Sequence, residues 1–163
     1  MSKYSVYKVT CQVTGMSRIG IEKGKGGKRF QQDLYLARTS PTSYFHWDLF
    51  RFGAERFDWA VLAVCDNRRD ADRLERYFIA KFRTEYPGGY NLTDGGGRGT
   101  RMSPAVKIRM LHDRVLKGKG YSPDQILRDR LREHLAMVEA RLLKAVHLNS
   151  TLRGDLDDAS DPA

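Results

Sequence analysis

The chain of 163 residues is 40% hydrophobic and 10% aromatic, which predicts one compact domain, alone or with a small appendage. Its formal charge is +9, and without the last ten residues, which hold four Asp and no Lys or Arg, it is +13. This basic body favours a nucleic-acid partner, with a ribosomal or membrane-surface protein as the alternative, and the lack of a long apolar run argues against a membrane-spanning protein.

The cysteines and histidines do not predict a metal cluster. Cys11 and Cys65 both fall in strand-like runs without a CxxC motif, so we expect buried free thiols in a reducing compartment and not a zinc finger. The four histidines are scattered on predicted helices and form no ligand set: His46, His112, His134 and His147. We find no signal peptide in the sequence and expect a cytoplasmic protein.

The first predicted element is a β-hairpin. Residues 4–13 are rich in β-branched and aromatic side chains, a Thr-Gly turn follows, and residues 16–21 form the partner strand. A two-residue turn places Cys11 opposite Arg18, so that Tyr7 and Arg18 project from the same face of the hairpin. These two residues are then either ordinary surface residues of a sheet or a phenol and a guanidinium held side by side.

Two helices and another strand are predicted next. Residues 22–28 form a flexible basic loop that lacks the spacing of a phosphate-binding Walker loop. Apolar residues at helical spacing predict helices over residues 28–38 and 42–52. The aromatic side chains of the second helix suit either nucleobase stacking or core packing, and we favour core packing. The nearly continuous apolar run of residues 57–65 predicts a central strand.

Residues 68–84 predict an amphipathic helix with one carboxylate on its apolar side. The stripe consists of Ala71, Leu74, Phe78, Ile79 and Phe82, and Glu75 occupies a position of this stripe where an apolar residue is expected. A carboxylate that faces the core costs several kcal/mol unless a positive group meets it. The helix leaves two explanations open, an internal salt bridge to an arginine or a bound metal ion.

Basic helical patterns replace strand patterns after Gly99. Ser103 and Pro104 predict the start of a helix that ends near Lys117, and a Gly-Lys-Gly hinge leads to a longer helix over residues 122–148 with a nearly heptad apolar stripe. The two helices either pack on the domain or on another subunit, or they form a DNA-binding appendage. We expect the acidic tail from residue 154 to be disordered.

Taken together, the hairpin, the arginine-led helix and the stretch from Glu75 onward resemble the GIY-YIG endonuclease family, the phage and intron-encoded homing enzymes above all. The resemblance covers residues 4–97 and rests on an ordered set of motifs, none of them specific alone. These motifs are Ser5-Val6-Tyr7, Arg18-Ile19-Gly20, Arg29-Phe30, Leu74-Glu75-Arg76-Tyr77-Phe78-Ile79 for the family's LE-x-Y/F-x-I pattern, and residues 89–96, GYNLTDGG, for its closing motif.

The resemblance implies an α+β fold with a small three-stranded, mostly antiparallel sheet flanked by helices, and a C-terminal helical appendage. It divides the chain into a nuclease domain over residues 1–97, a linker with a basic, modular DNA-binding helix over 98–121, a long helix over 122–153 and the tail over 154–163. It implies a Mg²⁺-dependent endonuclease, with Mn²⁺ also accepted, that cleaves double-stranded DNA in a bacterial or phage-infected cytoplasm. A homodimer through the long helix is an additional expectation.

The family pattern also implies a role for each site residue. Glu75 binds the single metal ion, Tyr7 acts as general base with its acidity raised by cations such as Arg18, Arg29 clamps the scissile phosphate, and Asn91 supports the adjacent loop. Arg18 contacts a phosphate or orients groups around the attacking water.

Three positions depart from the family pattern. Ser5 replaces the first glycine, Arg18 replaces the second tyrosine, and Asp33 stands where many relatives have a histidine, which either weakens phosphate contact or adds a water-mediated metal contact. The replacement at Arg18 supports an alternative from another class, a catalytically weakened relative that binds DNA as a regulatory protein. An RNA- or ribosome-associated protein, suggested by charge alone, leaves Glu75 without an explanation.

Overall fold

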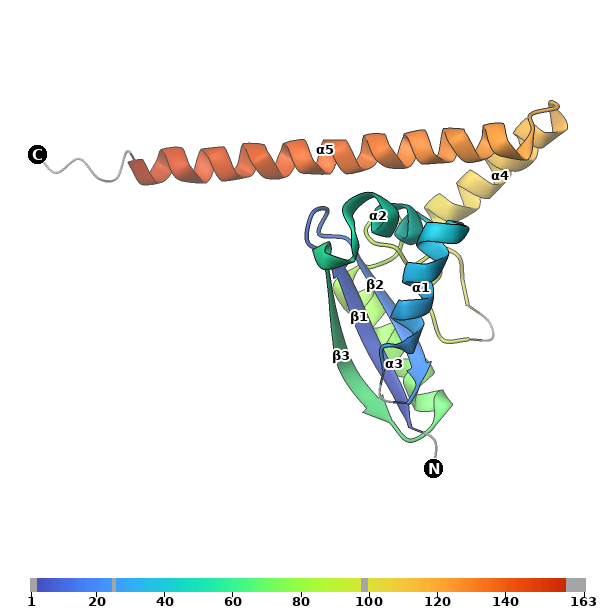
Figure 1. The fold of residues 1–163 in the computed structure, drawn as a ribbon, viewed down its shortest axis with the longest axis vertical. Helices are drawn as coiled ribbons and strands as arrows, with labels where there is room; N and C mark the ends of the chain where they lie inside the picture. Colours follow the sequence, from blue (N-terminus) through green and yellow to red (C-terminus); the bar gives the residue numbers. More distant parts are fainter. Residues whose placement is uncertain (1–2, 25, 98–99, 158–163) are drawn as a thin grey trace, which may run out of the picture.

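The computed structural model describes residues 3–24, 26–97 and 100–157, with side chains up to residue 148. It shows an α+β architecture in which two helices cover one face of a small antiparallel sheet and a third helix covers the other (Figure 1). The elements in chain order are β1 (Tyr4–Cys11), β2 (Ser17–Lys23), α1 (Lys28–Thr39), α2 (Tyr44–Phe52), the 3-10 turn η1 (Ala54–Arg56), β3 (Phe57–Cys65), α3 (Arg68–Phe82), α4 (Pro104–Gly118) and α5 (Pro123–Asp157).

The hairpin of β1 and β2 has a longer turn than predicted. The Cys11 amide donates to the Met16 carbonyl at 2.9 Å, so the loop has four residues, and Gly15 adopts a left-handed conformation with φ 70°. Arg18 therefore lies opposite Val9, and the predicted pairing with Cys11 is wrong by two residues. Because a shift of two residues preserves the face of every side chain, Tyr7 and Arg18 still project from the same side.

The predicted position of the third strand in the sheet is wrong. The strand order is β2-β1-β3, so β1 is central and β3 forms an edge. The bounds of β3 match the prediction, but its side chains are largely accessible, with Val64 58% exposed. A continuous apolar run has the same appearance in a buried strand and in this edge strand, which explains the error.

Two hydrophobic clusters, one on each face of the sheet, form the core. One cluster joins Tyr7 and Val9 of β1 to Phe45 and Leu49 of α2, which confirms core packing for the aromatic helix. The other joins the opposite side of the sheet to α3: Val6, Ile19, Cys65, Ala71 and Ile79. Both cysteines are buried and free, as expected.

Helix α3 has sharp ends, and its stripe is shorter than predicted. The Asn67 side chain caps its start by accepting from the Asp70 amide at 2.9 Å, and Arg83 in a left-handed conformation ends it. Phe82 is 38% exposed and lies beneath the Lys8 ammonium, 4.6 Å from the ring centroid, so it does not belong to the buried stripe. Phe82 is the last residue of α3, which places it past the edge of the core.

Helices α4 and α5 form a bent pair across the end of the sheet nearest α2, and α5 projects well beyond the body of the protein (Figure 1). Ser103 caps α4 as predicted, by accepting from the Val106 amide at 3.3 Å. Helix α5 continues to Asp157, so residues 154–157 are helical and the expectation of disorder there is wrong. Residues 158–163 of the predicted tail lie outside the described residues. Among the helices described, none combines the length and apolarity needed to cross a bilayer.

Candidate functional site

A cleft of about 610 Å³ lies along the edge strand β2, between α1 on one side and α3 on the other. Its walls come from β2, α1, α2, α3 and the loop that follows Tyr90. The five residues singled out from the sequence all line it: Tyr7, Arg18, Arg29, Glu75 and Asn91. The fold thus brings together residues that are up to 84 positions apart in the sequence.

Tyr7 lies flat against the backbone of Gly20, its partner on β2. A Cβ atom at Gly20 would come within 2.6 Å of the phenol oxygen, so only glycine at this position leaves room for the ring. Burial raises the pKa of Tyr7 to about 12, and this effect outweighs the opposing influence of Arg18 and Arg29. The nearby cations do lower the pKa of this phenol, as expected, but desolvation dominates, so the net pKa is raised and not lowered.

Glu75 reaches the cleft from α3 without a cationic partner. One carboxylate oxygen accepts a hydrogen bond from the Gly96 amide at 2.7 Å, and Glu75 forms no ion pair within the described part of the chain. Burial raises the pKa of this carboxyl, and the amide of Gly96 and the more distant Arg68 offset the shift only in part. Of the two explanations for Glu75, the internal salt bridge finds no support among these residues.

Asn91 fastens the glycine-rich loop to the edge of the sheet. Its side-chain amide donates to the Ile19 carbonyl at 2.9 Å, and its side-chain oxygen accepts from the Ile19 amide at 2.8 Å. This pair of bonds imitates a strand partner for β2. It holds the segment that leads to Gly96 beside Arg18 and Glu75, so the supporting role expected for Asn91 is geometrically reasonable.

Arg29 stands at the start of α1, and Glu22 fixes that start. The buried Glu22 carboxylate accepts from the amides of Gly27, Lys28 and Arg29 at 2.9, 2.9 and 3.1 Å. A carboxylate at a helix N-terminus is favourable because it meets free amides and the positive end of the helix dipole. Arg29 itself makes no ion pair with any described residue and is exposed at the cleft.

Arg18 crosses the cleft to α1. Its Nη1 lies 3.0 Å from Oδ2 of Asp33, and its guanidinium carbon lies 5.0 Å from the centroid of the Phe45 ring. Asp33 is only 3% exposed, and its second oxygen lies 3.2 Å from Nε2 of His46. The cleft therefore contains the Arg18–Asp33 ion pair and His46. The sequence of β2, α1 or α2 taken alone does not predict these contacts.

Three residues of the site were missed by sequence reasoning. His46 was set aside with the other scattered histidines, Glu22 was assigned to a flexible loop, and Arg68, which also lines the cleft, was taken only as the start of its helix. Glu22, six positions before an amide it caps, was the one with a local signal, because a carboxylate close to a helix start favours capping.

Two carboxylates line the cleft, of which Asp33 pairs with Arg18 and Glu75 forms no ion pair with any described residue. In the ranges that the structure describes, no group of three or more His, Cys, Asp or Glu side chains is placed to hold a metal ion.

Comparisons of the chain with protein-family models, with curated proteins and with solved structures gave no match.

Proposed function

We propose that the protein is a metal-dependent endonuclease of the GIY-YIG type that hydrolyses phosphodiester bonds in double-stranded DNA. The observation that carries this proposal is the unpaired, partly buried Glu75 in a cleft that also holds Tyr7, Arg18 and Arg29. Cleavage of a phosphodiester requires charge stabilisation, an oriented water and a rigid support, and these side chains together meet that requirement.

Glu75 fits a divalent cation. Its raised pKa shows that the ionised carboxylate is poorly compensated in the protein alone, which is the condition that a bound cation relieves. A single carboxylate on a rigid helix suits Mg²⁺, which retains most of its water ligands. When bound, such an ion supplies Lewis-acid stabilisation of the phosphate and a water of lowered pKa.

The arginines bind and orient the substrate in this proposal. Arg29, exposed and without an ion-pair partner in the described part of the chain, is free to form paired N–H···O bonds with the scissile phosphate. Tyr7, with a pKa of about 12, remains protonated at neutral pH, so it first orients the attacking water through its hydroxyl. Accepting a proton from that water requires more positive charge than Arg18 and Arg29 provide.

A second candidate function is a DNA-binding regulatory protein of the same fold. It is favoured by the raised pKa of Tyr7, which weakens the case for catalysis by this phenol, and by the replacement of the family's second tyrosine with Arg18. The two candidates share a DNA partner and differ in cleavage.

Incubation with nucleic acids separates these candidates. We expect the purified protein with 10 mM Mg²⁺ or Mn²⁺ to nick or cut plasmid DNA, and to leave an RNA of matched length intact, with EDTA abolishing cleavage. Agarose gels over a time course measure the products. Binding of duplex DNA without cleavage in either metal would favour the regulatory protein, and preferential binding of RNA would contradict both candidates.

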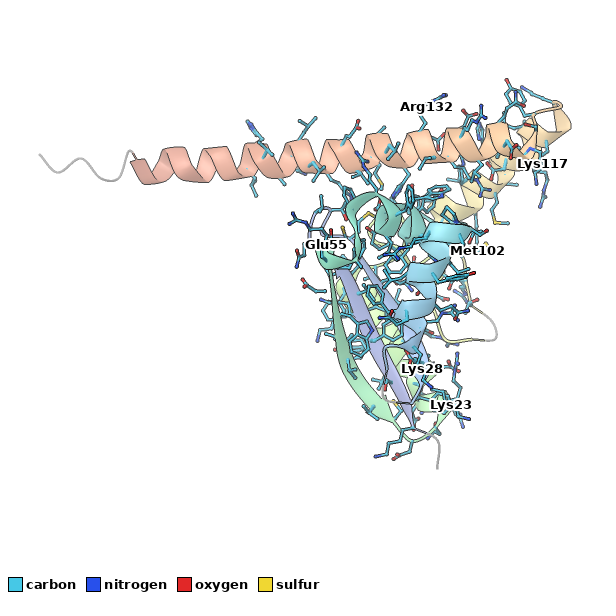
Figure 2. The ribbon with its side chains drawn as sticks, in the orientation of Figure 1. Lys23, Lys28, Glu55, Met102, Lys117 and Arg132 are labelled. Carbon is cyan, nitrogen blue, oxygen red and sulfur yellow. The ribbon has the colours of Figure 1, made fainter. Side chains whose placement is uncertain are left out.

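Helix α4 provides a test of the duplex-binding surface. Lys107, Arg114 and Lys117 are exposed and have no ion-pair partner in the described ranges, and Lys117 lies at the corner where α4 meets α5 (Figure 2). Replacing all three with Gln should weaken DNA binding and reduce the slope of log Kd against log salt by roughly 2–3, since each lost phosphate contact removes about 0.9.

The control for this variant is the triple replacement of Arg69, Arg73 and Arg132, exposed basic residues outside the cleft and α4. It removes the same formal charge. Fluorescence anisotropy with a labelled duplex over a salt series measures both. Equal slopes for the two variants would contradict a specific role for α4.

A further inference from the structure

The ion pair in the cleft joins two positions at which the chain departs from the family it resembles. Nη1 of Arg18 on β2 lies 3.0 Å from Oδ2 of Asp33 on α1, and Nε2 of His46 on α2 lies 3.2 Å from the other oxygen of Asp33. We propose that Asp33 and His46 are positioning residues that hold the Arg18 guanidinium toward the phosphate bound in the cleft. This inference rests on the proposed function for its substrate.

Arg18 is fixed on two sides and free on a third. Asp33 takes one of its Nη groups, and the buried ring of Phe45 supports the plane of the guanidinium from 5.0 Å. An arginine has five N–H donors, and among the described residues Arg18 donates only to Asp33. The side chain is 23% exposed and lines the cleft, so the remaining donors are available to a phosphate.

Asp33 is itself held in place by His46. The Nδ1 atom of His46 accepts from the Thr42 amide at 3.4 Å, which places the proton of the neutral ring on Nε2, facing Asp33. Both oxygens of Asp33 then have a partner, Arg18 on one and His46 on the other. Asp33 is therefore committed to orienting its neighbours and is not a free ligand for a metal ion.

The residues at positions 18 and 33 depend on each other energetically. A carboxylate at position 33, only 3% exposed, would lose its ion pair and keep only the contact with His46 if position 18 carried a neutral side chain. An arginine at position 18 without that carboxylate would keep several rotamers and hold no defined place in the cleft. Each residue thus depends on the other, and the pair acts as one replacement.

Kinetics on single and double variants test this dependence. We expect Asp33→Asn to lower kcat about tenfold without raising KM, because the guanidinium loses its orientation while the cleft loses a negative charge. In an Arg18→Ala background, Asp33→Asn should have no further effect on kcat. His46→Gln, which still offers an N–H, should lower kcat about threefold or less. Asp129→Asn breaks an exposed ion pair on α5 and serves as the control. Independent, multiplicative losses in the double variant would overturn the proposal.

NMR spectroscopy tests, without relying on catalysis, whether Asp33 holds the Arg18 guanidinium. In ¹⁵N NMR spectra, a guanidinium held by a carboxylate rotates slowly and gives separate Nη signals, whereas a free one averages them. We expect the Arg18 signals to be resolved in the wild type, to shift when a metal-free duplex oligonucleotide is added, and to average in Asp33→Asn. Resolved Arg18 signals in Asp33→Asn, or no shift with DNA, would overturn the proposal. Absence of cleavage by the wild type would refute the nuclease function alone.

Discussion

Glu75→Gln is expected to abolish DNA cleavage, with a loss in kcat on the order of 10³-fold, while duplex binding stays equal or becomes slightly tighter. The amide keeps the shape of the side chain and can still accept from Gly96, but it cannot compensate a cation. Cleavage of supercoiled plasmid and fluorescence anisotropy measure the two effects.

Stability should change in the opposite direction from activity. Because burial raises the pKa of Glu75, the unfolded protein holds the ionised form more readily, so the ionised carboxylate destabilises the folded state at pH values above its unfolded pKa. At pH 7.5 without metal, Glu75→Gln should therefore have a Tm equal to or above that of the wild type. A lower Tm would contradict the conclusion that the ionised Glu75 carboxylate destabilises the folded state.

The matched control is Glu55→Gln. Glu55 is exposed and lies beside the start of β3, well away from Lys28 at the start of α1 (Figure 2), and it should retain full activity. A direct readout of the metal is the amide signal of Gly96, which is bonded to Glu75. Mn²⁺ should broaden this signal in the wild type and not in Glu75→Gln. Equal cleavage by Glu75→Gln and the wild type would refute the metal role.

His134→Ala is expected to destabilise the protein by about 3 kcal/mol, because it removes a fully buried ring and one of the two partners of a buried carboxylate. His134 of α5 is fully buried, its Nε2 lies 3.1 Å from Asp48 of α2, and its ring packs on Tyr44 at a centroid distance of 4.8 Å. Asp48 also accepts from the hydroxyl of Tyr90 at 2.7 Å. The contacts from His134 through Asp48 to Tyr90 connect α5 to the segment that carries Asn91.

For a chain of this size, such a loss corresponds to a fall in Tm of roughly 6–12 °C. The control is His112→Ala, an exposed histidine on α4, which should change stability by no more than about 0.5 kcal/mol. Thermal unfolding followed by circular dichroism measures both variants. We also expect faster hydrogen exchange in α5 and at Asn91 in His134→Ala. An unchanged Tm would show that α5 does not depend on this contact.

The contact between His134 and Asp48 makes truncation of α5 an unsuitable test of DNA binding by the helical appendage. Removing α5 would expose Asp48 and the aromatic surface around Tyr44, which α5 now covers. A truncated protein could then lose DNA binding by misfolding, whatever the role of its basic residues. Charge replacement on the exposed side of α4 avoids this difficulty.

The sequence by itself determined the helices, the strands and the faces of both. Side-chain direction repeats every two residues in a strand, so Tyr7 and Arg18 were placed on one face even though the turn length was wrong. Local capping signals located the start of α4 at Ser103, and periodicity placed Glu75 on the inner side of α3. These properties depend on neighbours within one or two turns of chain.

Only the tertiary structure decided the electrostatics of the cleft and the order of the strands. Whether Glu75 meets a cation, whether Arg18 meets Asp33, and whether His46 enters the site depend on contacts between separate elements. The pKa of Tyr7 depends on how fully the ring is buried, and this burial outweighs the lowering of the pKa by nearby cations. Desolvation and charge pairing act through space, and periodicity along the chain does not record which elements become neighbours.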